Sequence, residues 1–230
     1  MISKTIVVTG ASRGIGKALV QELAADKQHH VIALSRDLKK MQQNFSALEN
    51  VSSYAFDLEL NVKEQIKIIT ENCPKIDLLI NNAGYLVKSS IPNIERNLLI
   101  KSFEINYFGV VDLVQALLPK MTSSISHIVN ISSMGAFQGS VKFPELSAYT
   151  SAKAALCNFT EQFAAENQGA NTRMNCLCLG AVQTEMLAQA FPGYQAPTTP
   201  IEMAKYIANF AEHSGQLLNG KIIPVSASNP

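Results

Sequence analysis

The sequence of 230 residues lacks a strong excess of one charge, long apolar runs and close spacings of metal ligands. Its formal net charge of +1 argues against nucleic acid or an anionic membrane surface as the main partner. No run approaches the roughly 18 apolar residues of a membrane span, and the first apolar stretch is too short for a secretory signal. We therefore expect a cytoplasmic protein with no membrane or nucleic-acid partner.

Cysteine is scarce, and the four residues Cys73, Cys157, Cys176 and Cys178 have no metal-ligand spacing. Cys176 and Cys178 are two apart in an apolar run, so on a strand they would share a face as small buried hydrophobes. No cluster of histidines is present. The cysteines are therefore interpreted as reduced thiols of a cytoplasmic protein, and no metal site is predicted.

Apolar residues are abundant, at 47% of the chain against 16% charged, which suits one α/β domain spanning residues 1–230. Several of the strand-length runs are apolar on consecutive residues, which is typical of strands covered on both faces. The predicted strands are Thr5–Val8, Val31–Leu34, Val51–Phe56, Asp77–Ile80, His127–Ile131, Asn175–Leu179 and Lys221–Val225.

Amphipathic segments separate these runs and predict helices that include Lys17–Leu23, Val62–Ile69 and a long Leu98–Leu118. Thr199 and Glu202 form a capping-box pattern around a proline at the first helical position. The alternation predicts a doubly wound parallel sheet of seven strands with helices on both faces.

The first strand runs into VVTGASRGIGKAL, where Gly10, Gly14 and Gly16 form a turn that opens a helix. Glycines let the backbone approach a phosphate closely, and a helix N-terminus offers unpaired N–H groups to it. In a strand–turn–helix at the start of an α/β chain, this pattern favours nucleotide binding over an ordinary turn.

The stretch AYTSAK places Tyr149 and Lys153 one helical turn apart, with small residues between them. On a helix the two side chains would share a face. A surface pair is the simplest interpretation. Alternatively, the lysine lowers the pKa of a tyrosine that acts as a general acid.

Seven segments together carry a resemblance to a known family. They are TGASRGIG at Thr9–Gly16, Asp57, NNAG at Asn81–Gly84, Asn106, ISS at Ile131–Ser133, Tyr149 with Lys153, and LGAVQT at Leu179–Thr184. In this order and at these separations the whole chain resembles the classical short-chain dehydrogenase/reductase family. The resemblance implies a Rossmann-type fold and hydride transfer between a nicotinamide cofactor and a carbonyl or alcohol.

The resemblance also implies catalytic roles. Tyr149 would be the proton donor, and Lys153 would lower its pKa and hold the nicotinamide ribose. Ser133 would donate to the substrate carbonyl, although Ser132 is a competing candidate. Asn106 would hold a water that relays protons to Lys153, whereas a mid-helix asparagine is otherwise exposed or bonded to nearby backbone.

The cofactor residues that the resemblance implies are Gly10, Ser12, Arg13, Gly14, Ile15, Gly16, Ser35, Arg36, Asp57, Leu58, Asn82, Ala83, Gly84, Tyr149, Lys153, Gly180, Val182 and Thr184. NAD-preferring chains place an acid where the second predicted strand ends, but here Ser35 and Arg36 follow that strand. A hydroxyl followed by a guanidinium suits a 2′-phosphate, and Arg13 can approach it from the glycine turn. NADP(H) is therefore predicted, with Asp37 as a rival acid or as a helix cap.

Two departures from the family pattern affect the site. Leu179 stands where the family usually has proline before the glycine, which predicts a looser turn. The separation from Ser133 to Tyr149 is longer than is common in the family, through SVKFPELS. That longer segment would border the substrate.

A lid is predicted over Gln183–Pro197, within about 183–200, with four apolar residues that face an opposite apolar wall. The lid residues are Met186, Leu187, Phe191 and Tyr194, and the wall residues are Leu86, Val87, Met134 and Phe137. They suggest a small to medium, fairly apolar ketone or aldehyde, or its alcohol. Reduction of a 3-oxoacyl thioester and a non-catalytic NADP-binding sensor or scaffold are the alternatives.

A homodimer or homotetramer is also predicted. The helices Leu98–Leu118 and Tyr149–Asn167 resemble those that pair subunits in the family. Leu156, Phe159 and Phe163 give the second helix more apolar residues than one face needs, although covering the sheet explains some of them.

Overall fold

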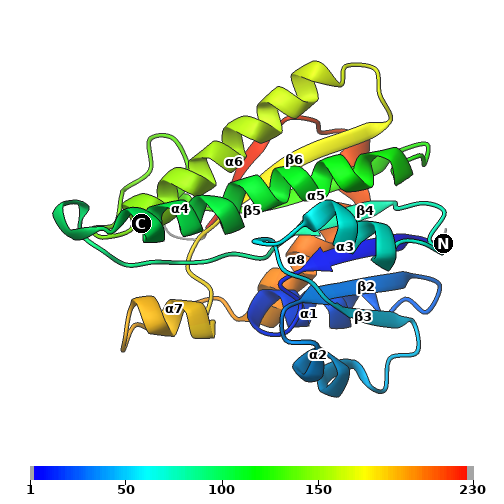
Figure 1. The fold of residues 1–230 in the computed structure, drawn as a ribbon, viewed down its shortest axis with the longest axis horizontal. Coiled ribbons are helices and arrows are strands. Elements are labelled where there is room, and N and C mark those ends of the chain that lie inside the picture. The colour runs from blue at the N-terminus through cyan, green and yellow to red at the C-terminus, as the bar shows by residue number, and fades with distance from the viewer. Residues whose placement is uncertain (1–2, 227–230) are drawn as a thin grey trace.

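The computed structural model describes residues 3–226, which form one parallel sheet of seven strands in the order β3-β2-β1-β4-β5-β6-β7 (Figure 1). This confirms the predicted fold class. Each predicted strand is present within a few residues. The strands are β1 Thr5–Thr9, β2 His30–Ser35, β3 Val51–Ala55, β4 Leu78–Asn81, β5 Ser126–Ser133, β6 Thr172–Leu179 and β7 Ile222–Val225.

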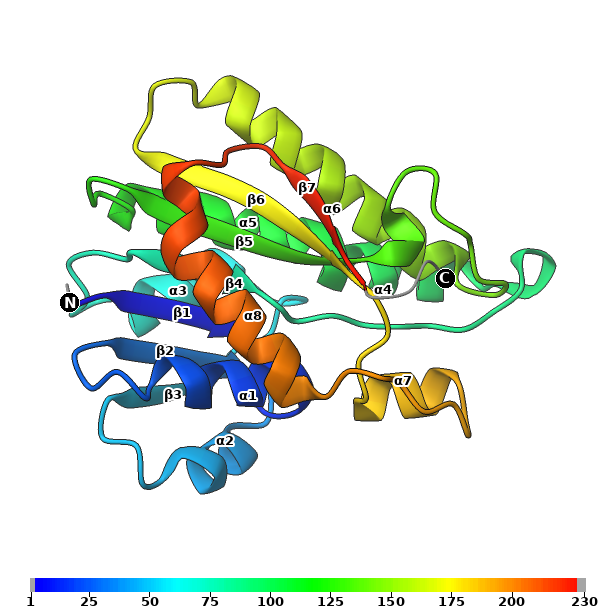
Figure 2. The same cartoon turned by 180° about the vertical axis from the view of Figure 1, so that it is seen from behind.

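Helices cover both faces of the sheet. Helices α3, α4, α5 and α6 lie in front of the sheet in Figure 1, and α1 and α8 lie over its other face in Figure 2. The helices are α1 Gly14–Leu23, α2 Leu38–Phe45, α3 Val62–Ile69, α4 Arg96–Phe103, α5 Gly109–Leu117, α6 Ser147–Glu166, α7 Glu185–Ala190 and α8 Pro200–His213. Within residues 3–226, none of them has both the length and the apolar character needed to cross a bilayer.

The sheet separates two cores because its strands are apolar on consecutive residues. In β1, Ile6 and Val8 pack into the core beneath α1 and α8, while Val7 packs into the core beneath α3 and α5. All three side chains are fully buried. Alternating side chains on one strand thus serve opposite faces, as the unbroken apolar runs predicted.

The predicted long helix over Leu98–Leu118 is interrupted, which corrects the sequence prediction. A π-helical turn, Glu104–Phe108, separates α4 from α5. The amide of Asn106 donates to the backbone oxygens of Ser102 at 2.9 Å and Tyr85 at 2.8 Å. A side chain that bonds to the backbone competes with regular helix geometry, and such wide turns often occur at functional sites.

The predicted start of the last helix is confirmed. Thr199 Oγ1 accepts from the backbone N–H of Glu202 at 3.2 Å, and the Glu202 carboxylate accepts from the N–H of Thr199 at 2.8 Å. Pro200 occupies the first helical position. This capping box fixes where α8 begins, immediately after the predicted lid.

The strand order reverses between β1 and β4, which pair directly with one another. In a doubly wound sheet, ligands bind beyond the carboxyl ends of the strands at this reversal. Figure 2 shows that α7 lies beyond this same end of the sheet. The fold therefore brings the glycine turn, the ends of β4 to β6 and the predicted lid to one place.

Candidate active site

A cleft of about 810 Å³ lies at the carboxyl ends of the strands. Its walls come from the glycine turn, the ends of β2, β4, β5 and β6, the start of α6, and α7. All predicted site residues except Asn106 line this cleft. Val182 is one of those that line it. One cleft thus receives almost every residue that the sequence singled out.

The glycine turn brings the backbone so close to its neighbours that two positions exclude any side chain. Gly10 has φ +69°, and a Cβ there would lie 2.8 Å from Ala83 Cα. A Cβ on Gly16 would lie 2.2 Å from the carbonyl oxygen of Gly10. The turn itself lines the cleft at the N-terminus of α1, where N–H groups and the helix dipole favour a phosphate.

The loop after β4 is fastened to the end of β1. Thr9 Oγ1 accepts from the backbone N–H groups of Asn82 and Ala83, both at 3.0 Å. Asn81 donates to the side chain of Asn130 on β5 at 2.8 Å, which ties β4 to β5. These bonds fix the floor of the cleft from Asn82 to Gly84.

The end of β2 carries one hydroxyl, that of Ser35, where an NAD-preferring chain would carry an acid. Ser35 Oγ donates to Ser12 Oγ at 3.0 Å, which joins β2 to the glycine turn. Asp37 caps α2 by accepting from the N–H of Lys40 at 3.0 Å. The helix-cap interpretation of Asp37 is therefore confirmed, but Asp37 also lines the cleft, so its interpretation as a rival acid stays open.

Three cations reach this end of the cleft, namely Arg13, Arg36 and Lys40. Lys40 is not among the cofactor residues predicted from the sequence. Its place in the first turn of α2, directly after the Asp37 cap, was the available signal. Arg36 is 62% exposed and lies 3.6 Å from the Glu59 carboxylate.

Asp57 follows β3 and lines the cleft. Its carboxylate accepts from the backbone N–H of Glu59 at 3.0 Å. The next helix, α3, is capped by Asn61 instead. Asp57 is therefore not the cap of that helix. The next residue, Leu58, also lines the cleft.

Tyr149 and Lys153 lie on one face of α6 and both line the cleft, so they are not a solvated surface pair. Lys153 is buried, and its Nζ donates to the backbone oxygen of Ile131 at 2.8 Å. Ser132 Oγ donates to the backbone oxygen of Lys153 at 3.0 Å. Ser132 is thus engaged with α6, and Ser133 is the hydroxyl that hydrogen-bonds to Tyr149.

Burial dominates the electrostatics of this pair. It raises the pKa of Tyr149 to about 12, against a smaller opposing effect of the Ser133 hydrogen bond. It lowers the pKa of Lys153 to about 8. Lys153 Nζ donates to the Ile131 carbonyl here, so the lowering of the Tyr149 pKa by Lys153 stays a prediction. Tyr149 is therefore a neutral phenol with a proton to donate at pH 7.

Asn106 is fully buried and lies behind the cleft rather than in its wall. Its Oδ1 accepts from the N–H of Tyr85 at 3.1 Å. A Cβ on Gly84 would lie 3.3 Å from Asn106 Oδ1 and 3.6 Å from Lys153 Nζ. The missing side chain of Gly84 thus leaves space between Asn106 and Lys153.

The turn after β6 remains well paired despite Leu179. The strand pairing with β7 includes Leu179 opposite Val225, and the N–H of Gly180 donates to the Val225 oxygen at 2.9 Å. The predicted loosening is therefore not seen, because the pairing with β7 extends through Gly180. Further on, Val182 bridges to Thr198, and Thr184 caps α7 by accepting from the Leu187 N–H at 3.2 Å.

The substrate end of the cleft agrees in part with the prediction. All four lid residues line it, as do Leu86 and Met134 of the opposite wall. Val87 and Phe137 do not, because Val87 is buried and Phe137 packs against Met134 and the cysteines of β6. Phe143 and Leu146, from the longer segment before α6, line the cleft in their place.

The longer segment also contacts the lid. The rings of Phe143 and Phe191 lie 6.0 Å apart, edge to face. Lys88 Nζ lies 5.5 Å from the centre of the Phe191 ring and 3.3 Å from the Glu145 carboxylate. Phe191 is therefore held between two segments that approach the lid from different strands.

This fold and this cleft define a doubly wound α/β protein whose site brings together a glycine-rich turn, a tyrosine and a lysine. The family model described as "short chain dehydrogenase" matches residues 4–195. The chain belongs to the short-chain dehydrogenase/reductase family, whose members are oxidoreductases that bind a nicotinamide cofactor and small-molecule substrates.

Curated relatives include "Dehydrogenase/reductase SDR family protein 7-like" of Drosophila melanogaster, 30% identical over 83% of this chain and 60% of that protein. "Oxidoreductase BOA17" of Botryotinia fuckeliana is 32% identical over 92% of this chain and 76% of its own length. "Fatty acyl-CoA reductase" of Acinetobacter baylyi is 31% identical over 93% of this chain and 77% of its own length. This chain thus spans about 60 to 77% of the length of these relatives.

Solved structures agree on the fold. A "short chain dehydrogenase/reductase family protein" superposes with a TM-score of 0.85 at 27% identity, over 96% of this chain and 95% of that one. A 3-ketoacyl-(acyl-carrier-protein) reductase from Brucella melitensis complexed with NADH superposes with a TM-score of 0.87 at 21% identity, over 98% of each chain. A short chain dehydrogenase from Burkholderia cenocepacia in complex with NADP superposes with a TM-score of 0.87 at 23% identity, over 98% of this chain and 97% of that one.

Proposed function

We propose that this chain is an NADP(H)-dependent reductase of a small to medium, fairly apolar ketone or aldehyde, or oxidises the corresponding alcohol. The observation that carries the proposal is the division of the cleft. Arg13, Arg36 and Lys40 reach one end, Tyr149 and Lys153 line its middle, and apolar side chains line the other end.

The residues present fit a nicotinamide dinucleotide. The Gly10–Gly16 turn lines the cleft at the start of α1, where unpaired N–H groups would receive a pyrophosphate. Ser35 and the cations around it suit a 2′-phosphate better than a 2′-hydroxyl. Asp57 would bond the adenine amino group. The remaining contacts are assigned to Ser12, Ile15, Leu58, Asn82, Ala83, Gly84, Gly180, Val182 and Thr184.

When bound, the nicotinamide supplies the hydride, and its oxidised ring carries a positive charge. Tyr149 donates a proton to the substrate oxygen, and Ser133 donates a hydrogen bond to the same oxygen. Lys153 stabilises the phenolate that remains after transfer. Asn106 would hold a water that returns a proton to Lys153 through the space beside Gly84.

The apolar end of the cleft supports the substrate class. Phe143, Leu146 and Met134 face the lid residues Leu187 and Phe191 around it. Burying apolar substrate surface there is favourable, whereas a substrate carboxylate would lose its hydration without gaining an arginine partner. Lys88 is engaged with Glu145 and Phe191 instead.

A second candidate is the reduction of an acyl thioester. The similarity to the fatty acyl-CoA reductase of Acinetobacter baylyi, 31% identical, favours it. Such a substrate would place its long acyl chain against the apolar end of the cleft. The two solved structures in complex with NADH and NADP are less than 25% identical to this chain and support only the fold.

Assembly into a homodimer or homotetramer is part of the proposal. Of the three residues that suggested an apolar excess on α6, Leu156 and Phe163 are buried and only Phe159 is partly exposed. Ile100 on α4 and Phe108 in the π-helical turn are 46% and 47% exposed and would be covered by a second copy. Light scattering that finds only monomer at working concentration would contradict this assembly.

The function is tested with a panel of apolar ketones, aldehydes and acyl-CoA thioesters, each offered with NADPH and with NADH. Absorbance of the reduced cofactor reports turnover. We expect oxidation of NADPH with at least one apolar ketone or aldehyde. Turnover of thioesters alone would favour the second candidate, and binding of NADPH without turnover of any compound would favour a sensor.

A further inference from the structure

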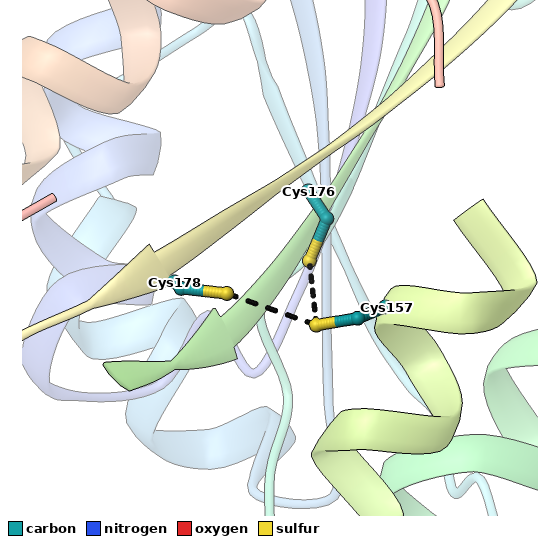
Figure 3. Close-up of side chains that lie close together, drawn as sticks. All are labelled: Cys157, Cys176 and Cys178. Atoms are coloured by element: carbon teal, nitrogen blue, oxygen red, sulfur yellow. Dashed lines mark hydrogen bonds between the residues drawn. The ribbon is translucent and has the colours of Figure 1, made fainter. Parts of the chain in front are cut away.

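Three thiols that the sequence separates meet directly behind the candidate active site. Cys176 and Cys178 project from β6 toward α6, and Cys157 projects from α6 toward them (Figure 3). Cys157 follows Lys153 by one helical turn, so the cluster lies beneath the lysine of the proposed reaction. The fold, and not a sequence spacing, creates this group.

The sulfur atoms are already at the separations of a metal site. Cys157 Sγ lies 3.8 Å from Cys176 Sγ and 3.7 Å from Cys178 Sγ, and all three sulfurs lie within 4.8 Å of one another. With a metal–sulfur bond of about 2.3 Å, a planar three-coordinate site needs sulfurs about 4.0 Å apart. Small side-chain movements would therefore suffice.

The donor set selects a soft ion. Residues 3–226 contain this one group of at least three His, Cys, Asp or Glu ligand atoms close enough to share an ion, and every member is a cysteine. Met134, whose thioether is another soft donor, packs in the same buried cluster. Soft sulfur ligands favour Cu(I) and related ions over Mg²⁺ or Ca²⁺, which prefer oxygen.

The surroundings already orient the ligands. Cys157 Sγ donates to Ser132 Oγ at 3.4 Å, and that hydroxyl donates to the Lys153 carbonyl at 3.0 Å. Partners outside the ligand set fix the direction of a ligand and tune its affinity. Cys176 and Cys178 are fully buried and Cys157 is 8% exposed, so a bound ion would be shielded from water.

We propose that Cys157, Cys176 and Cys178 form a binding site for a soft cation of the Cu(I) type, held by three thiolate sulfurs. Each thiol gives up its proton to solvent as its metal–sulfur bond forms, and nothing is oxidised. This site differs from the cofactor cleft, whose walls contain none of the three cysteines. The proposal does not depend on the function proposed above.

The test is an anaerobic competition for Cu(I) between the reduced full-length chain and a coloured Cu(I) chelator, followed until the absorbance is constant. Cys157→Ser keeps the size of the side chain but replaces a soft ligand with a hard one. Cys73→Ser is the matched control, because Cys73 is half-buried and lies outside the cluster. Wild type and Cys73→Ser should each withdraw one equivalent of Cu(I), and Cys157→Ser should lose this uptake.

Equal uptake by wild type and Cys157→Ser, or no uptake by wild type, would overturn the site and leave the cysteines as apolar packing. Circular dichroism and the thermal midpoint establish that Cys157→Ser folds. If it does not, X-ray absorption at the copper edge of the wild-type complex decides the question. Three sulfur neighbours would support the site, and fewer than three sulfurs or a shell of nitrogen and oxygen would refute it.

Discussion

Cofactor choice depends on the cations at the end of β2, and two adjacent lysines offer a matched comparison. Lys40 lines the cleft, whereas Lys39 does not, and both are exposed residues in the first turn of α2. Lys40→Ala and Lys39→Ala therefore make the same change in charge and nearly the same change in helix composition. Only the first should weaken NADPH binding.

The magnitude follows from a charge-assisted contact to a 2′-phosphate. Such contacts contribute about 1.5–3 kcal/mol, which corresponds to roughly 10- to 150-fold in affinity. Solvent screening weakens exposed charges. Arg36 is 62% exposed, so its contribution to the NADPH binding free energy should lie near the lower end of this range. We expect Arg36→Ala and Lys40→Ala each to raise the NADPH dissociation constant about tenfold and to leave that of NADH nearly unchanged.

Glu59 tests the same reasoning with the opposite sign. Its carboxylate lies 3.6 Å from both Arg36 and Lys101, so it competes with a phosphate for Arg36. Glu59→Gln should therefore tighten NADPH binding. Ser35→Asp with Arg36→Ala should shift the preference toward NADH, because a carboxylate repels a 2′-phosphate and accepts from a 2′-hydroxyl.

Isothermal titration calorimetry suits these measurements, since the chain has no tryptophan whose fluorescence could be followed. Both cofactors are titrated at low and high salt, and the preference for NADPH should decrease as salt increases. Equal losses in Lys39→Ala and Lys40→Ala would refute the reasoning. So would a wild-type chain that binds NADH as tightly as NADPH.

Three further predictions concern stability, the cofactor cradle and the substrate end. Burial lowers the pKa of His127 to about 4, so the unfolded chain binds the proton first as pH falls below about 6.5. Folding stability on the order of 3 kcal/mol should therefore be lost between about pH 6.5 and 4. The urea midpoints of wild type and His127→Gln should converge as the pH falls. Midpoints that stay equally far apart at every pH would contradict this. Gly16→Ala should abolish measurable cofactor binding, since its Cβ would lie 2.2 Å from the Gly10 oxygen; calorimetry that finds wild-type affinity would disprove the cradle. Phe143→Ala should raise KM for an apolar substrate about 2- to 12-fold through loss of the Phe191 contact, with the NADPH dissociation constant unchanged; a change in the cofactor constant alone would argue against its place in the substrate wall.

The sheet was predictable because its apolar runs reflect burial on both faces, a property of each strand by itself. The interruption of the helix over Leu98–Leu118 was not, because it depends on bonds from Asn106 to Tyr85, a residue 21 positions away. Local periodicity contains no information about such a partner.

Within the site, the motifs identified the elements more reliably than the side-chain directions. The choice between Ser132 and Ser133 depends on which face of β5 meets α6, since adjacent strand residues point to opposite faces. Phe137 and Phe143 are both aromatic residues between β5 and α6, yet only Phe143 reaches the cleft. The course of a loop, and not its composition, decides such cases.

The cysteines illustrate the same limit. The prediction that Cys176 and Cys178 share a strand face is confirmed, because both lie within hydrogen-bonding range of Cys157 on the α6 side of the sheet. The sequence interpretation nevertheless found no metal site, because the three ligands become neighbours only when α6 packs on β6.

The central claim is that Tyr149 donates the proton to a carbonyl substrate in a cofactor-bound cleft. The most direct measurement is the rate of NADPH oxidation by Tyr149→Phe with the best substrate of the panel, at cofactor concentrations that calorimetry shows to be saturating. The phenylalanine keeps the ring and removes only the hydroxyl, so NADPH binding should be retained while kcat falls by roughly a hundred- to ten-thousandfold. Turnover by Tyr149→Phe at the wild-type rate would contradict the account.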